Sequence, residues 1–418
     1  MYNQFQFCPL PADLWIGLLF GTSFASKKLN VLFGQELFKE ETMGFSERSA
    51  IIREIEAYRG SRVLTYVMSD RTGFPPGFVL PGQNAQLAGE AIYFIYEQLK
   101  NIGKVDKLDL FLYTRGGEVD SVWPLVNICR EYVRQRFSVL VPFRAHSGGT
   151  MICLGADETV MSECAELSPV DPTTGNQFNP VDELTRQRRG ISVEDVTSYI
   201  ELAMDPSKRS EVAGKDQPEF EEDRQHERIL QAFKRLSETV DPVALGNVNR
   251  AHTQIRLLSE KLLTLAANGQ NLDIKRIVNY LTKSLYSHGH AINRNEARLI
   301  LGDRIKDADD SEQRLLWNLY KEYAATLLLN QPLCQDAIVQ EAIANPNRVI
   351  ALNGAFIETA IQSTIFKSHF TLQPTQQIPA NIHVQVPPGQ PLPMIPGVAV
   401  NVQYKMIDLS WRANEEGV

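Results

Sequence analysis

Two strand-like segments in the middle of the chain end in glycine turns, and each turn opens a helix-like stretch. The segment 107–114 (KLDLFLYT) leads into RGGE at 115–118, and the segment 137–145 (FSVLVPFRA) leads into HSGG at 146–149. Strands that alternate with helices of this length predict βαβ crossovers and therefore a mainly parallel sheet. The predicted fold class is α/β.

Apolar periodicity predicts the other elements of this region. The stretch 119–136 carries its apolar side chains at helical spacing, so it is expected to cross from the first strand to the second. Upstream, a helix is predicted over 46–58 with Ser46 as its N-cap, followed by a strand over 61–69. A strand over 157–162 completes the predicted core.

The composition changes along the chain and suggests four segments. Residues 1–45 are expected to be an N-terminal docking segment, and 46–305 the α/β core with a charged insertion at about 205–228. Residues 306–370 are expected to be a helical extension, and 371–418 a proline-rich extended arm. Further helices are predicted over 85–102, 192–203, 227–239, 249–267, 271–285, 294–302, 311–330, 334–344 and 354–367.

The arm has an unusual composition for a free tail. Residues 371–400 contain seven prolines and no Asp, Glu, Lys or Arg, and the stretches 381–386 and 398–404 alternate like strands. An exposed segment of this kind would be prone to aggregate. We therefore expect it to dock on its own core or on a neighbouring subunit, the alternative being a disordered proline-rich tail.

Charge and cysteine content exclude several kinds of protein. The formal net charge of −8 argues against nucleic acid as a partner, because a phosphate backbone calls for a basic surface. Five cysteines without a CxxC pair favour a reducing, cytoplasmic location. The apolar run at 14–20 is too short to span a membrane, and no signal peptide is expected.

No cofactor or metal is expected either. The sequence has no P-loop, and RGGEVD lacks the G-x-G-x-x-G spacing of dinucleotide sites. His288 and His290 have no cluster of carboxylates or thiolates nearby at the spacing of metal ligands.

The two glycine turns are the candidate site, because ligands of α/β sheets bind at the carboxyl ends of the strands. Free backbone N–H groups at a helix start favour a negatively charged oxygen. A serine among such donors, Ser147, suits acyl transfer, in which a nucleophile stands beside an oxyanion hole. The alternative is that both turns are structural and that Ser147 is a helix N-cap.

Four blocks of sequence carry a family resemblance: YRGSRVLTYV at 58–67, YTRGGEVDS at 113–121, HSGGTMICLGADETVMSECAELSPVDP at 146–172 and YSHGHAINRNEARLILG at 286–302. In these blocks the chain resembles the serine dehydrogenase proteinase family, serine peptidases of the Clp-protease/crotonase fold related to signal peptide peptidase A. The blocks span roughly residues 50 to 305 in the order of that family.

The resemblance implies a Clp/crotonase-type core and roles for three residues. Ser147 would be the nucleophile, and the N–H groups of Gly117 and Gly148 would form the oxyanion hole. It also implies a polypeptide substrate and a homo-oligomer. Membrane contact is not expected, because the apolar run at 14–20 is short.

The general base departs from the pattern of the relatives. Clp-type proteases place a histidine before a proline about two dozen residues after the serine, where this chain has SPVDP at 168–172. Relatives with a Ser–Lys dyad place the lysine where this chain has Arg186, which does not deprotonate near neutral pH. His288 matches the histidine of another family block, so we predict it as the base, the alternative being a histidine that only hydrogen-bonds its loop.

The predicted function is a serine peptidase that acts through an acyl-enzyme on Ser147. One alternative is a catalytically impaired pseudo-peptidase that binds peptides or serves as a scaffold, because the usual base and acid are missing. Another is a crotonase-like enzyme on acyl thioesters, which would use the same pair of N–H groups without needing Ser147.

Overall fold

The structure, a computed structural model, describes residues 44–75, 77–170, 173–174, 177–182, 188–204, 223–267, 273–284, 289–376, 395 and 398–413. The chain divides into two compact units. Unit 1 takes its described residues from 1–86, 93–114 and 309–418, and unit 2 takes them from 87–92 and 115–308.

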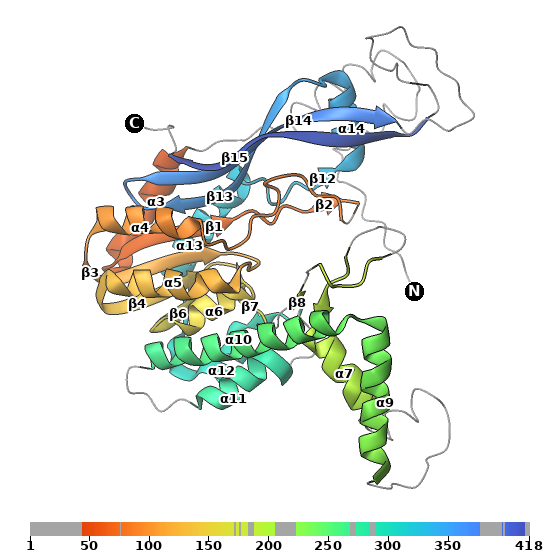
Figure 1. Cartoon of the computed structure of the whole chain (residues 1–418). Coiled ribbons are helices and arrows are strands. Elements are labelled where there is room, and N and C mark those ends of the chain that lie inside the picture. Colours follow the sequence, from red (N-terminus) through yellow and green to blue (C-terminus); the bar gives the residue numbers. More distant parts are fainter. Residues whose placement is uncertain are drawn as a thin grey trace. The chain divides into compact units, whose positions relative to one another are not determined.

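Unit 1 is built on a sheet with the strand order β3-β1-β13-β14-β15 (Figure 1). β1 and β3 run parallel, whereas the pairs β1–β13, β13–β14 and β14–β15 are antiparallel. The bounds of these strands are Arg62–Met68 for β1, Val105–Tyr113 for β3, Val349–Glu358 for β13, Ser363–Gln376 for β14 and Val400–Ala413 for β15.

The helices of unit 1 come from both ends of the chain. They are α3 (Phe45–Arg59), α4 (Ala91–Ile102, most of it in this unit), α13 (Asp310–Thr326) and α14 (Gln335–Ala344). Two short strands, β2 (Gly73–Phe74) and β12 (Leu333–Cys334), pair in parallel.

A buried ion pair ties α3 to β13 in the core of unit 1. Arg48 and Glu358 are 2% and 0% exposed, and two hydrogen bonds of 2.8 and 2.9 Å join them. The hydroxyl of Tyr323 on α13 also donates to Glu358, at 2.6 Å, as does that of Ser363 on β14, at 2.5 Å. The carboxylate thus joins four elements that are far apart in the sequence.

Unit 2 holds two small sheets that matter for the candidate site. Its parallel strands have the order β11-β6-β4, and a second sheet has the order β10-β7-β5. Their bounds are Ile305–Asp307 for β11, Glu158–Met161 for β6, Val133–Val141 for β4, Ile292–Asn293 for β10, Glu166–Leu167 for β7 and Arg144–Ala145 for β5. The strands β8 (Thr173–Thr174) and β9 (Ile191–Ser192) form a separate antiparallel pair.

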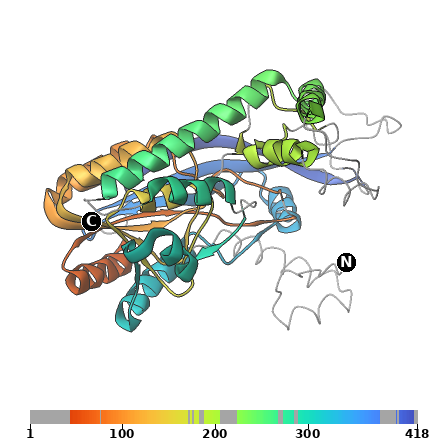
Figure 2. The same cartoon turned by 90° about the horizontal axis from the view of Figure 1, so that it is seen from below.

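Helices make up most of the rest of unit 2, and the longest of those described is α10 (Figure 2). They are α5 (Val119–Glu131), α6 (Gly148–Leu154), α7 (Val193–Met204), α9 (Asp223–Thr239), α10 (Pro242–Ala266), α11 (Ile274–Asn279) and α12 (Arg294–Leu301). A π-helical turn, η1 (Tyr280–Ser284), extends α11, and a 3₁₀ turn, η2 (Gly302–Arg304), follows α12.

The fold-class prediction is confirmed. In unit 1 the order β1–α4–β3 is a βαβ unit with parallel strands, and in unit 2 the parallel strands β4 and β6 have α6 between them in sequence. Most of the strand expected over 398–404 forms the beginning of β15, and that expected over 381–386 lies outside the described residues. The four proposed segments of the chain stay predictions.

Three local predictions were wrong. Residues 354–367 form parts of β13 and β14, not a helix. The N-cap of α3 is Gly44 rather than Ser46, and it makes no side-chain capping bond. α5 ends at Glu131, because strand β4 already begins at Val133.

Candidate active site

The first glycine turn follows β3 and requires glycine at Gly116. This residue has a φ of +105°, and a β-carbon there would lie 2.7 Å from the β-carbon of Ser147. Side chains are strained at such a φ, and real β-carbons do not approach other atoms so closely. The glycine therefore lets the first turn lie directly against the second.

The orientation of the Gly117 amide follows from a short parallel bridge with Leu87. The N–H of Leu87 donates to the carbonyl of Gly116 at 2.9 Å, and the N–H of Glu118 donates to the carbonyl of Leu87 at 2.8 Å. Because N–H groups alternate in direction along extended backbone, the N–H of Gly117 points away from Leu87.

The second turn holds Ser147 in an unusual backbone conformation. Its φ of 50° and ψ of −112° lie outside the regions that non-glycine residues normally adopt. Such a conformation costs about 1–3 kcal/mol and is concentrated at functional sites. Ser147 occupies the N-cap position of α6, but its side chain makes no capping hydrogen bond. The half-buried hydroxyl is therefore not used to cap the helix.

Ser168 holds the backbone of this turn. The N–H of Ser147 donates to Oγ of Ser168 at 2.7 Å, and that hydroxyl donates to the carbonyl of Pro169 at 2.9 Å. Thr150 Oγ1 lies 2.9 Å from the carbonyl of Ala145 and accepts from the N–H of Ser168 at 3.0 Å. These buried hydroxyls connect α6 to the chain that follows β7, which offsets the strain at Ser147.

The two predicted donors of the oxyanion hole are neighbours. A β-carbon on Gly148 would lie 3.8 Å from the backbone nitrogen of Gly117 and 2.7 Å from Cδ1 of Leu87. Gly148 is the first residue of α6, where a backbone N–H has no partner within the helix. The structure thus brings Ser147, Gly117 and Gly148 together, and their chemical roles stay predictions.

His288, the predicted base, lies outside the described residues, but the chain on both sides of it is anchored. Before it, the carbonyl of Leu281 on η1 accepts from the N–H of Val170 at 3.0 Å. After it, Ile292 on β10 pairs with Leu167 on β7. Both anchors therefore lie next to Ser168, the residue that binds Ser147.

A family model of ClpP-like SDH-type serine proteinases matches residues 29–210. This part of the chain is thus similar to that family. The match spans both glycine turns and Ser168, whereas His288 lies beyond it. The predicted resemblance is confirmed, and the ClpP-like family is one of serine proteinases.

Two curated proteins of Methanocaldococcus jannaschii, MJ1495 and MJ0137, both described as uncharacterized, are also similar. They are 30% and 28% identical to this chain over 156 and 157 residues. The alignments cover 36% and 37% of this chain and 50% and 52% of the relatives. The chain thus spans about half the length of the curated relatives it matches.

Among solved structures, a mutant of the 1510-N membrane-bound stomatin-specific protease aligns with 54% of this chain and 77% of that one. The identity is 12% and the TM-score is 0.32.

Ser168 and Thr150 belong to the candidate site, and the sequence did not predict them. Both lie in the block 146–172 that carries the resemblance, but a hydroxyl that supports a backbone has no signature of its own. Only the distances to Ser147 and Ala145 show what these side chains do.

His146 precedes Ser147 and is partly buried, with a side chain that is 15% exposed. Its Nε2 lies 3.1 Å from Oε1 of Glu166, within ion-pair reach but without hydrogen-bond geometry. Burial is the largest of the effects that together lower the pKa of His146 to about 4; the charges of Arg115 and Arg144 act in the same direction, and Glu166 opposes them. The imidazole is therefore neutral at pH 7.

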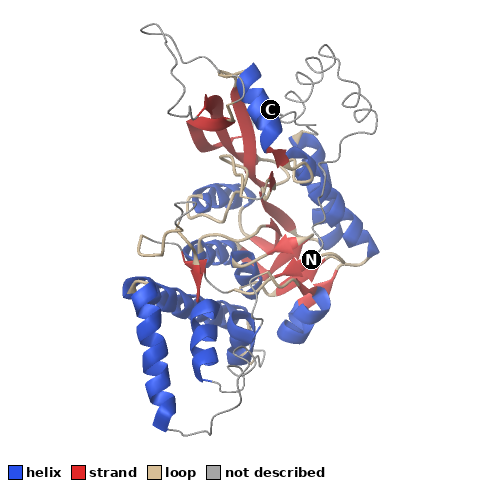
Figure 3. Cartoon of the chain, turned by 90° about the vertical axis from the view of Figure 1, so that its right-hand side faces the viewer, coloured by secondary structure: helices blue, strands red, loops and turns tan. Residues whose placement is uncertain are grey.

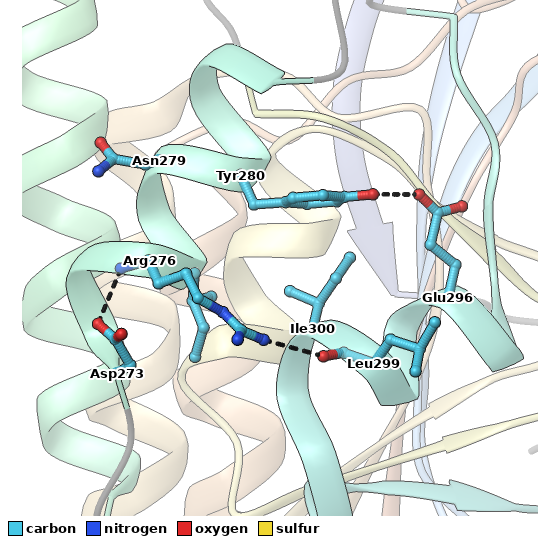
Figure 4. A pocket seen from close by; sticks show the side chains of 8 residues that line it. Asp273, Arg276, Asn279, Tyr280, Glu296, Leu299 and Ile300 are labelled. Atoms are coloured by element: carbon cyan, nitrogen blue, oxygen red, sulfur yellow. Dashed lines mark hydrogen bonds between the residues drawn. The ribbon is translucent and has the colours of Figure 1, made fainter.

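A separate pocket of about 590 Å³ lies among α11, η1 and α12 (Figure 4). Within it Tyr280 donates to Glu296 at 3.0 Å, and Arg276 reaches the carbonyl of Leu299 at 3.4 Å. Glu296 also contacts Nε2 of His290 at 3.0 Å. The predicted site residues that the structure describes do not line this pocket.

The described part of the chain contains neither a metal-binding cluster nor a membrane-spanning helix. No three or more His, Cys, Asp or Glu side chains are grouped there in a way that could hold a metal ion. None of the helices in that part is both long and apolar enough to cross a membrane.

Proposed function

We propose that this chain is a serine peptidase that acts through an acyl-enzyme on Ser147. The observation that carries the proposal is the backbone of Ser147, held at a φ of 50° against Gly116, with the hydroxyl not used as a helix cap. A serine in a strained strand-to-helix turn presents its hydroxyl for attack. The similarity of residues 29–210 to a serine proteinase family supports the same activity.

The chemistry would proceed in two steps. Oγ of Ser147 attacks the carbonyl carbon of the scissile peptide bond while the base takes the hydroxyl proton. The N–H groups of Gly117 and Gly148 stabilise the oxygen that becomes negative, and the base returns the proton to the leaving amine. Water, deprotonated by the same base, then hydrolyses the ester and frees Ser147.

We propose His288 as that base. Its neighbours in sequence support the assignment, because the anchors at Leu281 and Ile292 lie beside Val170 and Leu167, on either side of Ser168. Histidine also has the ordinary pKa best suited to proton transfer near pH 7. His290 is the matched control, because its Nε2 already contacts Glu296.

The proposal includes a polypeptide substrate, a cytoplasmic location and a homo-oligomer. The free thiols of Cys129, Cys153, Cys164 and Cys334 support a reducing compartment. The similarity to that family supports a polypeptide substrate.

Labelling with a fluorophosphonate tests the proposal, because this reagent needs an activated serine. We expect one label per chain, which maps to Ser147 and is lost in Ser147→Ala. A protein that is folded but unlabelled would instead be a pseudo-peptidase that binds peptides, or a crotonase-like enzyme that uses only the two N–H groups. Hydrolysis of an acyl thioester by Ser147→Ala would identify the latter.

A further inference from the structure

Strand β15 leaves a long edge of the unit 1 sheet open. It has fourteen residues and pairs with β14 on one side, and within the described residues no strand pairs with its other side (Figure 3). Such an edge offers a row of unpaired backbone groups to another strand. Four large apolar side chains stand along it: Tyr404, Met406, Ile407 and Leu409, which are 52%, 39%, 54% and 48% exposed.

A β-bulge in the middle of β15 decides which side chains share a face. Opposite β14, Met406 pairs with Phe370 and Asp408 pairs with His369, so Ile407 is the extra residue. Phe370 belongs to the apolar cluster that α14 covers, so Met406 lies on that face.

The bulge reverses the alternation of side chains along the strand. Before Ile407 the even-numbered residues are on the apolar face, and after it the odd-numbered ones are, including Trp411, which packs on Phe366 and Phe94. The opposite face is polar on both sides of Ile407. The apolar set is Val402, Tyr404, Met406, Leu409 and Trp411, and the polar set is Gln403, Lys405, Asp408, Ser410 and Arg412.

This pattern makes β15 complementary to a second copy of itself. In an antiparallel pairing centred between Met406 and Ile407, every apolar residue faces an apolar one, and Lys405 faces Asp408 of the other copy. The opposed pairs are Val400 with Ala413, Asn401 with Arg412, Val402 with Trp411, Gln403 with Ser410, Tyr404 with Leu409, Lys405 with Asp408 and Met406 with Ile407.

Neighbouring registers lack this match. A shift of one or two residues in either direction puts Met406 or Ile407 opposite Lys405 or Asp408. The matching register is also centred on the strand, so all fourteen residues take part. A twofold axis at this point repeats each contact twice, as an isologous interface requires.

We propose that β15 is a dimerisation surface, on which the β15 strands of two copies pair antiparallel about the midpoint of Met406 and Ile407. The two sheets then continue into one, with both apolar faces on the same side. This inference names an interface for the proposed homo-oligomer and does not rest on the peptidase activity, because labelling at Ser147 and the mass of the assembly are measured separately.

The first test is the mass of the purified full chain across a concentration range by analytical ultracentrifugation. We expect a dimer or an even-numbered assembly, and Ile407→Lys should raise the dissociation constant of the β15 contact at least about 30-fold. Leu230→Lys, at a side chain 68% exposed on α9, is the matched control and should change nothing. A monomer at all concentrations would overturn the proposal.

Cross-linking tests the register itself and does not depend on weakening the assembly. Gln403→Cys and Ser410→Cys proteins, in a background where the exposed Cys164 is serine, are mixed, allowed to exchange subunits and oxidised. The mixture should form a disulfide-linked dimer, because opposed residues lie within the reach of a disulfide. Neither protein alone should do so.

The off-register pair Lys405→Cys with Ser410→Cys is the control, and it should stay unlinked because diagonal neighbours lie too far apart. Equal cross-linking of both pairs, or a dimer that Ile407→Lys leaves intact, would contradict the proposal. Monomers that float with phospholipid vesicles, and lose this binding in Ile407→Lys, would assign the apolar strip to a membrane surface instead.

Discussion

The turn at Ser147 and the C-terminal strands β13–β15 differ in where their structural information lies in the sequence. The site at Ser147 joins two short segments that each carry their own glycine signal, with Gly116 and Gly148 allowing a close approach. The strands β13–β15, here called the ribbon, depend on partners far away in the sequence. Glu358 on β13, for example, is bound by Arg48, which lies 310 residues earlier. Local sequence therefore describes the first region well and the second poorly.

The same difference predicts how substitutions act. Changes at the turn should alter reactivity at Ser147, because the strained backbone and the N–H groups act directly there. Changes in the ribbon should alter stability or assembly and leave that reactivity unchanged, because none of its residues is proposed to touch the reacting atoms.

The largest effect is expected for His288→Ala, which should lower kcat by about 10²–10⁴-fold. Activity of the unaltered protein should rise with pH through the ordinary histidine pKa of about 6.5, because only the neutral imidazole accepts a proton. The variant should lose this limb in a kcat–pH profile. His290→Ala should keep both rate and limb, and equal losses in the two variants would refute the assignment.

The largest effect on stability is expected at the ion pair that joins α3 to the ribbon. Arg48→Met leaves the carboxylate of Glu358 buried without its cation, which should cost about 3–5 kcal/mol of unfolding free energy. The double variant Arg48→Met/Glu358→Gln should recover part of that loss. Chemical denaturation measures both, and the labelling rate at Ser147 in the folded state should not change. A changed rate would show that the two regions are coupled.

A glycine substitution at the turn should affect both properties. Gly116→Ala places a β-carbon 2.7 Å from that of Ser147 and at a φ of +105°, which should cost about 2–4 kcal/mol and slow labelling. Gly246→Ala on α10 is the control, because a β-carbon there meets open space. It should be neutral or stabilising by up to about 1 kcal/mol in thermal melts. Normal labelling of Gly116→Ala would mean that the close approach is not needed.

The smallest effect is expected from acid and the burial of His146. Its folded-state pKa of about 4 lies below the unfolded value of 6.5, so the unfolded chain binds more protons between these values. Stability is therefore complete above about pH 6.5 and falls by up to about 3 kcal/mol as the pH drops to 4. His146→Gln should flatten this part of a stability–pH curve. A slope that does not change would place the acid sensitivity elsewhere.

Particular residues explain how much could be predicted from the sequence. Apolar runs bounded by glycine turns predict the strands β1 and β3 and the helix α6. The same pattern predicts that the turns of Gly117 and Ser147 lie close together. Residues 354–367 are predicted to be helical, but they form parts of β13 and β14. In the structure the polar Glu358 is buried and is bound by Arg48. A partner so distant in the sequence leaves no local signal in this segment.

Ser168 shows the same limit within the candidate site. Its hydroxyl fixes the backbone of Ser147 across 21 residues of sequence, and no spacing rule announces such a contact. The Ser46 prediction failed for a related reason, since the helix start depends on where the chain enters from Gly44 rather than on the best capping residue.

The most direct test of the account is the structure of the protein after reaction with a fluorophosphonate. We predict phosphorus bonded to Oγ of Ser147, with the phosphoryl oxygen about 2.7–3.1 Å from the backbone nitrogens of both Gly117 and Gly148. A phosphoryl oxygen turned to solvent, or an adduct on any other serine, would contradict the claim that these two turns form one catalytic site.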